Sequence, residues 1–184
     1  MDLRTIVLID GENLYNRYKA CIDSGSEPAT SVTCFNNFVW APGILHIYDT
    51  MEILRVSYYN TFVGSLDELE ALNNKISKIG YEFTYEQQYS RKSTIVPRIF
   101  KKENRSKGTK SVDINISIDA LRSAYNDTID RLILVSGDGD YIPLIEEVMR
   151  QNVQVYVGAL SSGLNPQLES KCDKFYNLDK VLLK

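Results

Sequence analysis

One short stretch late in the chain limits the fold more than any other. Residues 132–135 are four consecutive apolar side chains, a pattern typical of a buried strand in a parallel sheet. The run ends at Ser136-Gly-Asp138-Gly-Asp140, where two glycines allow a sharp turn. An apolar segment with Pro143 in its first turn follows, which predicts the start of a helix. A strand that leads directly into a helix is the unit of an open α/β sheet, whose ligand sites lie at the strand tips.

The N-terminus repeats this pattern. Residues 5–9 predict another apolar strand, and the segment Asp10-Gly-Glu-Asn13 separates it from a helix-like stretch over residues 14–21. If the two strands are neighbours, the sheet brings Asp10 beside Asp138 and Asp140. Carboxylate oxygens are the ligands that hard divalent cations prefer, so Asp138 and Asp140 are the first candidates for chemistry.

The remaining pattern predicts one domain over residues 1–184. Residues 52–62 and 81–85 predict strands, and a capping box (Ser65 and Glu68) begins the helix between them, which implies a parallel crossover. A further strand is expected at residues 154–160. Residues 22–50 are too apolar for a disordered segment, so we expect a folded insertion there.

Residues 91–110 are strongly basic. Eight cations oppose a single acid, Glu103, and the polar content predicts a loop. Most basic runs are only solvated surface, but a positive segment just before an acidic one is also what a phosphodiester substrate requires. The candidate nucleic-acid-binding residues are Arg91, Lys92, Arg98, Lys101, Lys102, Arg105, Lys107 and Lys110.

Three ordered motifs together resemble the NYN family of PIN-like nucleases. They are the strand followed by Asp10-Gly-x-Asn13, the mid-chain Lys110-x-x-Asp113, and the late Ser136-Gly-Asp138-x-Asp140-Tyr-x-Pro-Leu. The resemblance implies a three-layer α/β/α, Rossmann-like fold with a central, mostly parallel sheet of five or six strands. Gly139 departs from the family pattern, where serine is common, and we expect the change to affect loop stiffness more than chemistry.

The resemblance also decides the structure expected around Asp113. Residues 112, 114, 116 and 118 alternate strictly and by themselves predict a strand, whereas the family has a helix here. In a helix, Asp113 and Asp119 point in different directions, so they cannot face one ion. The family places Asp113 in a metal-binding position, which leaves Asp119 as an outer acceptor or a polar residue on the far face.

The family function implied is metal-dependent hydrolysis of RNA. Asp10, Asp113, Asp138 and Asp140 would be the catalytic and metal-binding residues, with Mg²⁺ or Mn²⁺ lowering the pKa of the attacking water. Asn13, Asp119 and Ser136 would support the ligands or position the substrate. RNA is the expected partner ahead of single-stranded DNA, and a homo-oligomer is left open.

Several alternatives remain beside this one. Asp10 and Asp140 are also favoured helix caps, and a non-catalytic RNA-binding or scaffold protein would use the basic segment alone. A phosphotransfer receiver domain would need a phosphoacceptor aspartate on a middle strand, and none occurs in residues 52–62. The glycine motifs that cradle nucleotide cofactors are absent, and the lone His46 disfavours a hydrolytic triad.

Composition adds a few limits. The three cysteines are scattered and odd in number, which indicates a reducing cytoplasm and no disulfide framework. We expect no signal peptide, because a strand begins within a few residues of the N-terminus, and no run is long enough to cross a membrane. The net charge of −3 does not by itself indicate a nucleic-acid partner.

Overall fold

The computed structural model describes residues 3–46, 51–85, 89–103 and 111–184. Its strands are β1 (Arg4–Asp10), β2 (Thr33–Phe35), β3 (Phe38–Trp40), β4 (Glu52–Phe62), β5 (Gly80–Tyr85), β6 (Tyr89–Thr94), β7 (Val96–Lys101), β8 (Arg131–Val135), β9 (Gln154–Ala159) and β10 (Lys174–Asn177). Its helices are α1 (Gly11–Asp23), α2 (Gly43–His46), α3 (Leu66–Ile76), α4 (Ser111–Tyr125), the 3₁₀ turn η1 (Gly139–Tyr141), α5 (Ile142–Arg150), α6 (Leu168–Lys171) and α7 (Asp179–Leu182).

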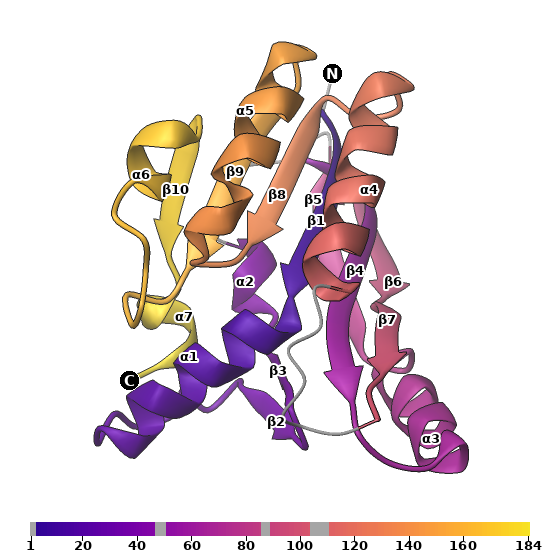
Figure 1. Cartoon of the computed structure of the whole chain (residues 1–184), viewed down its shortest axis with the longest axis vertical. Coiled ribbons are helices and arrows are strands. Elements are labelled where there is room, and N and C mark those ends of the chain that lie inside the picture. Colours follow the sequence, from indigo (N-terminus) through magenta and orange to yellow (C-terminus); the bar gives the residue numbers. More distant parts are fainter. Residues whose placement is uncertain (1–2, 47–50, 86–88, 104–110) are drawn as a thin grey trace.

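A six-stranded sheet in the order β10-β9-β8-β1-β4-β7 forms the middle layer, and every neighbouring pair is parallel (Figure 1). The expected α/β/α fold is therefore confirmed. The chain proceeds outward from β1 through β4 to β7, then returns to β8 on the other side of β1. This order places a topological switch point between β1 and β8, the position where doubly wound sheets leave a crevice for ligands.

Successive side chains along the central strands point to opposite faces of the sheet, and apolar residues form a core on each face. Ile6 and Leu8 of β1 pack with the apolar sides of α4 and α5, while Val7 and Ile9 pack toward α1 and the inserted segment. Helices α4 and α5 cover one face, as Figure 1 shows, and the second core includes residues of α1, β3, α2 and α7. Both sides of the sheet are thus buried, which explains the nearly continuous apolar runs of its middle strands.

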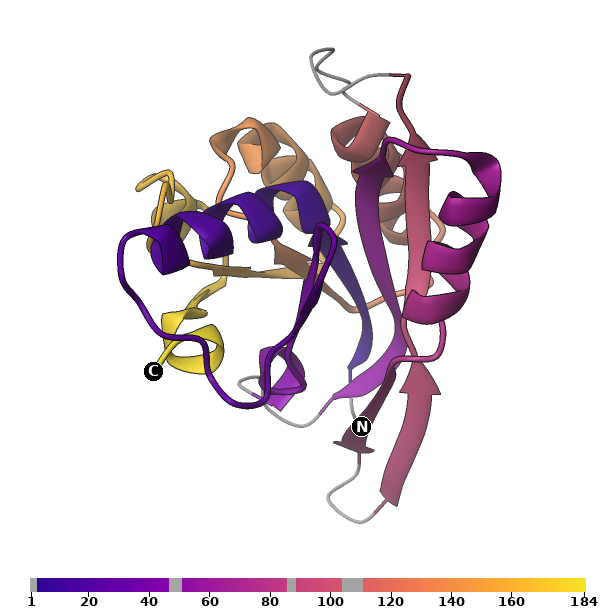
Figure 2. The same cartoon turned by 90° about the horizontal axis from the view of Figure 1, so that it is seen from below.

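The insertion expected at residues 22–50 is folded over its described part. The strands β2 and β3 form an antiparallel hairpin, and the short helix α2 follows it. Phe38, Val39 and Trp40 are each at most 1% exposed and belong to the core on the α1 side of the sheet. Figures 1 and 2 both show the hairpin between α1 and α3. The insertion therefore adds a wall beside the C-terminal end of β4, to which Asn37 is bonded.

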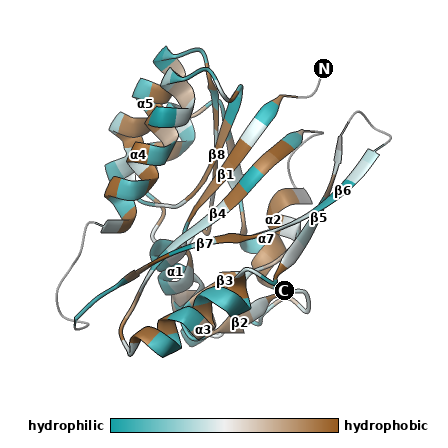
Figure 3. Cartoon of the chain, turned by 90° about the vertical axis from the view of Figure 1, so that its right-hand side faces the viewer, coloured by the Kyte–Doolittle hydropathy of each residue, from teal (hydrophilic) through white to brown (hydrophobic). Residues whose placement is uncertain are grey.

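Two expectations about the middle of the chain are wrong. Residues 91–94 and 96–101 of the expected basic loop are strands β6 and β7. The strand that pairs parallel with β4 on the side away from β1 is β7, whereas β5 pairs antiparallel with β6 in a separate two-stranded ribbon. All described side chains of β6 are exposed, and Figure 3 shows this hydrophilic strand extending away from the layers. A charge count alone could not distinguish an exposed strand from a loop.

Helix α4 resolves the conflict between the two patterns at residues 111–121. Val112, Ile116 and Ala120 recur every four residues and are buried, while Ile114 and Ile118 are 53% and 45% exposed. The helical reading is confirmed, and two isoleucines remain at the surface. All three cysteines are free. Within the described ranges, no helix is both long and apolar enough to cross a membrane.

Candidate functional site

The candidate site is built around Asp10, where β1 ends and α1 begins. Strands β1 and β8 are adjacent, with Ile9 opposite Val135, so Asp10 and Ser136 come from neighbouring strand tips at the switch point. Gly11 is required here because a Cβ at this position would collide with the Tyr58 ring and come within 2.7 Å of the Tyr59 carbonyl oxygen. The close approach of α1 to β4 fixes where the Asp10 carboxylate lies.

Both oxygens of the Asp10 carboxylate accept hydrogen bonds. Oδ1 caps α1 by accepting from the backbone N–H of Asn13 at 3.0 Å. Oδ2 accepts from the Ser136 hydroxyl at 3.1 Å and lies 3.3 Å from the Tyr141 hydroxyl. Asp10 is only 3% exposed. The helix-capping role considered from sequence is thus real, but it uses only one of the two oxygens.

Tyr141 connects Asp10 to the second acid of the site. Its hydroxyl lies 3.1 Å from Oδ1 of Asp113, in the first turn of α4. A hydroxyl carries one proton and donates to one acceptor at a time, so the two carboxylates share this donor. Tyr141 is buried and ends the 3₁₀ turn that follows Asp138. Two acids separated by about a hundred residues therefore converge on a single hydroxyl group.

The surroundings of both acids favour their protonated forms. Burial raises the pKa of Asp10 to about 6, the charge of Asp113 adds to this, and the bonds from Asn13, Ser136 and Tyr141 oppose it. Burial also raises the pKa of Asp113, and the negative charges of Asp138, Glu12 and Asp140 raise it further. Burial is thus the main reason that the pKa of each acid is raised, and the like charges of neighbouring carboxylates add to it.

The loop after β8 is held by short polar bonds. The backbone N–H of Gly137 donates to Oδ1 of Asn13 at 3.0 Å, which ties the loop to α1. The Ser136 hydroxyl also accepts from the N–H of Asp138 at 3.2 Å. Asp138 is half-buried and accepts from the N–H of Asp140 at 3.0 Å, whereas Asp140 is exposed. Asn13 and Ser136 thus support the site through the backbone of this loop.

Sequence reasoning missed Glu12 and Tyr141. Glu12, in the first turn of α1, accepts hydrogen bonds from the Thr61 hydroxyl and from Lys102 Nζ, the latter at 2.9 Å. It thereby connects the carboxylate cluster, which consists of Asp10 and Asp113 with Asp138 nearby, to the ends of β4 and β7. The only signals in the sequence were the position of Glu12 two residues after Asp10 and that of Tyr141 beside Asp140. Neither contact could be read from local spacing.

Comparison with known proteins agrees with this architecture. A family model for the NYN domain matches residues 4–179. The chain belongs to the NYN family. No curated protein matches it significantly in sequence. The crystal structure of a protein of unknown function from Vibrio parahaemolyticus is similar, with a TM-score of 0.64, 20% sequence identity, and coverage of 100% of this chain and 97% of that one. At this identity the likeness supports the fold alone.

NYN domains are PIN-like nuclease domains, typically ribonucleases that depend on a metal ion. Within the described ranges, no group of three or more His, Cys, Asp or Glu side chains is arranged to hold an ion. The donor chemistry nevertheless fits, because Mg²⁺ is usually bound through one or two carboxylates and retained waters. Asp10 and Asp113 supply two carboxylates at a shared hydroxyl, with the charge of Asp138 close by.

The glycine that departs from the NYN pattern has a steric explanation. A Cβ at residue 139 would collide with the side-chain amide of Asn165. The Asn165 side chain is held through its Oδ1, which accepts from the N–H of Gln167 at 2.9 Å, and the backbone N–H of Asn165 donates to the Gly137 carbonyl at 3.0 Å. Glycine at this position therefore accommodates the loop that carries Asn165, an effect on packing more than on chemistry.

Other predicted site residues lie elsewhere. Asp119, also on α4, accepts from the Tyr59 hydroxyl at 2.6 Å and pairs with Arg122 of the same helix. Arg98 lines a small cavity together with Asp119. Asp119 is thus an acceptor for a tyrosine of β4, and it shares no hydrogen bond with Asp10, Asp113 or Tyr141 among the described residues. It is consequently a matched internal control for Asp113, since both are aspartates of one helix.

The basic residues divide between two edges of the sheet. Arg91 pairs with Glu52, the first residue of β4, at 3.3 Å and lies with Lys92 in the β5–β6 ribbon. The N–H of Lys102 donates to the carbonyl of Phe62, the last residue of β4. Lys101 and Lys102 therefore lie at the edge of the sheet formed by the C-terminal ends of its strands, which is the edge that carries Asp10. The expectation that all eight cations flank the acids is wrong for the first group. Three more, Arg105, Lys107 and Lys110, lie outside the described residues.

Proposed function

We propose that this NYN-domain protein is a divalent-cation-dependent ribonuclease that cleaves RNA at the Asp10–Asp113 site. One observation carries the proposal: two carboxylates from different elements converge on the Tyr141 hydroxyl at the sheet's switch point. Burial and like charge raise the pKa of both groups, an arrangement that costs stability in the metal-free protein. Perturbed acids in a crevice are typical of functional sites.

The residues divide the work as follows. Asp10 and Asp113 would hold Mg²⁺ or Mn²⁺, with Asp138 beside them and Asp140 at the exposed rim. When bound, the cation offsets phosphate charge and acidifies a water molecule for attack on phosphorus. The Tyr141 hydroxyl orients the two carboxylates, and Ser136 and Asn13 hold the loop that carries Asp138. Lys101 at the same end of the sheet attracts the backbone of the RNA, whereas Lys102 is paired with Glu12.

A second candidate is a non-catalytic RNA-binding NYN protein. It is favoured by the bonding of Asp10, whose two oxygens are occupied by the α1 cap, Ser136 and Tyr141 without any ion. In that case the acids only stabilise the fold, and the basic residues at the same edge of the sheet bind the RNA. The two candidates differ in one measurable property, because only the first predicts cleavage that disappears with the carboxylates.

The test is cleavage of labelled single-stranded and hairpin RNA in Mg²⁺, Mn²⁺ or EDTA by wild type, Asp113→Asn and Asp119→Asn. Loss of electrostatic stabilisation at Asp113 should lower the rate at least about a hundredfold. Asp119→Asn, on the same helix but outside the cluster, should retain most of the activity. Equal rates in wild type and Asp113→Asn would reject this site, and RNA binding without any cleavage would favour the second candidate.

A further inference from the structure

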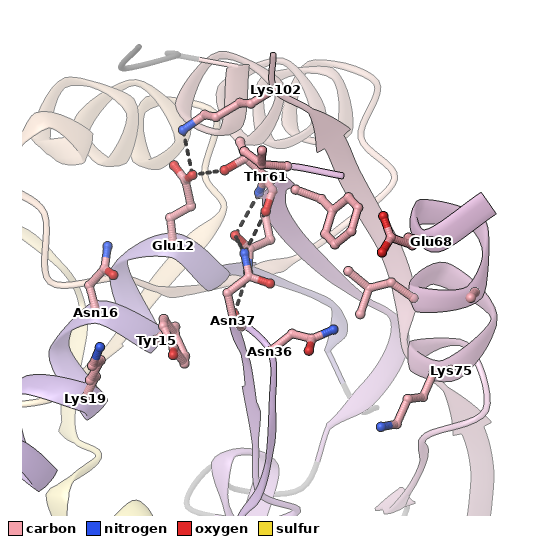
Figure 4. A pocket seen from close by; sticks show the side chains of 15 residues that line it. Glu12, Tyr15, Asn16, Lys19, Asn36, Asn37, Thr61, Glu68, Lys75 and Lys102 are labelled. Carbon is pink, nitrogen blue, oxygen red and sulfur yellow. Dashed lines mark hydrogen bonds and ion pairs between the residues drawn. The ribbon is translucent and has the colours of Figure 1, made fainter. Parts of the chain in front are cut away.

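A cavity of about 800 Å³ lies beside the carboxylates and has no role in the chemistry described above. It is bounded by α1, the β2–β3 hairpin, the end of β4 and α3, as Figure 4 shows. Glu12 and Lys102, which form an ion pair at 2.9 Å, belong to its lining. Because Glu12 follows Asp10 by two residues, the cavity opens next to the candidate site. Its size is in the usual range for small-ligand pockets.

The wall contributed by the insertion is held in place by an amide pair. Nδ2 of Asn37 donates to Oδ1 of Asn60 at 3.1 Å and to the Thr61 carbonyl at 2.6 Å, and Asn60 returns a bond to the Asn37 carbonyl at 2.7 Å. Asn60 is 1% exposed. These three bonds join the hairpin to the end of β4. The cavity is therefore bounded by a fixed wall and exists before any ligand arrives.

The groups that face this cavity match a nucleotide in kind. Tyr15 and Phe62 offer aromatic faces, on which bases of single strands stack. Asn36, at the hairpin turn with φ of 49°, presents an amide toward the cavity (Figure 4). An amide both donates and accepts, so it can bond to the edge of a base. Among the described residues, the Asn36 side chain has no hydrogen-bond partner, which leaves it available to a ligand.

The charges of the lining favour a phosphate-bearing ligand. Glu12 is paired with Lys102, and Glu68 accepts the N–H of Ser65 in the capping box of α3. Lys19 and Lys75 have no carboxylate partner within the described part of the chain, and Lys75 Nζ lies 3.8 Å from the Phe35 ring centroid. Two ammonium groups without a carboxylate partner thus lie at the cavity, on α1 and α3, and they outnumber the remaining carboxylate of the lining, Glu68. Ammonium groups bind phosphate as point charges.

We infer that this cavity binds one unpaired nucleotide of the RNA next to the bond that is cleaved. The base stacks on Tyr15 or Phe62 and bonds to Asn36, and Lys19 and Lys75 contact the adjoining phosphates. A base held in a duplex cannot enter such a cavity, so single-stranded RNA is the substrate class. The inference rests on the proposed function for the position of the scissile bond, but the binding event itself requires no catalysis.

The experiment measures binding in EDTA, so that cleavage does not contribute. Fluorescent single-stranded hexanucleotides of adenine, uracil or cytosine, and a blunt RNA duplex, are titrated into wild type, Tyr15→Leu, Asn36→Ala, Lys75→Gln and Lys180→Gln. Tyr15→Leu keeps apolar packing but removes the stacking face, so it should weaken single-strand binding at least about fivefold and leave duplex binding unchanged. Asn36→Ala should change the relative affinities of the three sequences.

Comparison of Lys75→Gln with Lys180→Gln distinguishes binding in the cavity from general attraction to surface charge. Lys75→Gln should weaken all three single strands alike and reduce the slope of log K against log salt by about 0.7, whereas Lys180→Gln on α7 should leave both unchanged. Melting temperatures show that each variant is folded, and the surface variants Asn36→Ala and Lys75→Gln decide the matter if Tyr15→Leu does not fold.

Two results would overturn the inference. The first is that Asn36→Ala and Lys75→Gln both bind single strands with wild-type affinity. If the protein nevertheless cleaves RNA, the proposed function stands and nucleotide binding in the cavity is rejected. The other is duplex binding as tight as single-strand binding. Cavity-dependent binding by a protein that cleaves nothing would support the inference and reject the proposed function.

Discussion

The buried carboxylate of Asp10 should make the fold less stable at neutral pH than in mild acid, and Asp10→Asn should remove this effect. Burial raises its pKa to about 6 from the ordinary 3.8. In the unfolded chain the carboxyl returns to the ordinary value. Below both pKa values the group is protonated in either state, so it has no effect on stability there. As the pH rises, the unfolded state loses its proton first and is favoured.

The size of the effect follows from the shift. Each pKa unit corresponds to about 1.4 kcal/mol, so two units give about 3 kcal/mol once the pH exceeds the pKa of the folded protein. About 2 kcal/mol of this should develop between pH 4 and pH 7. Asparagine caps a helix about as well as aspartate, so Asp10→Asn retains the start of α1 while remaining neutral at every pH.

The assay is urea unfolding of wild type and Asp10→Asn in EDTA at several pH values. All other titrating groups are common to both proteins, so the difference in their free energies of unfolding reports residue 10 together with its coupling to Asp113. We expect this difference to move in favour of the variant between pH 4 and pH 7 and to level off above the pKa of Asp10. A difference that stays constant with pH would refute the reasoning, since the carboxylate would then carry no burial penalty.

Three further results are expected. Tyr141→Phe should lower the free energy of unfolding in EDTA at pH 7 by about 1 to 3 kcal/mol, because a carboxylate loses its donor, and an unchanged urea midpoint would contradict the shared bond. Lys101→Gln should reduce the salt slope of single-strand RNA binding by about 0.7, while Arg91→Gln at the opposite edge should not, and equal slopes would disprove the assignment of edges. Ile116→Ala should cost about 2 to 5 kcal/mol in urea unfolding and Ile118→Ala little, unless α4 has another rotation.

The sheet could be predicted because its signals are local and repeated. The apolar runs before Asp10 and Ser136, each followed by glycine and a helix, identify parallel strands without any tertiary information. Residues 112–118 show the limit of such reasoning. Their strict alternation imitates a strand, and the burial of every fourth residue in α4 becomes apparent only when Ala120 is counted with Val112 and Ile116.

The rest of the site depends on contacts between distant parts of the chain. Glu12 is joined to Thr61 and Lys102, which lie 49 and 90 residues away in sequence. No spacing rule relates these positions. In β7 the apolar residues are interspersed with cations, and the segment was predicted to be a loop because of its charge although it forms a strand. Charge predicts what a segment can attract, whereas its backbone conformation is set by what it packs against.

The bonding of Asp10 has a consequence for reading the sequences of other NYN proteins. One of its oxygens holds the first turn of α1, a task that is required whether or not the protein cleaves anything. A descendant that lost catalysis would still be selected to keep aspartate or asparagine at this position. The Asp113 side chain caps no helix, and among the described residues it is hydrogen-bonded to the Tyr141 hydroxyl alone, so we expect it to be lost first when catalysis is lost. In a lineage of unknown activity, the residue aligned with Asp113 is therefore the more informative marker of a working enzyme.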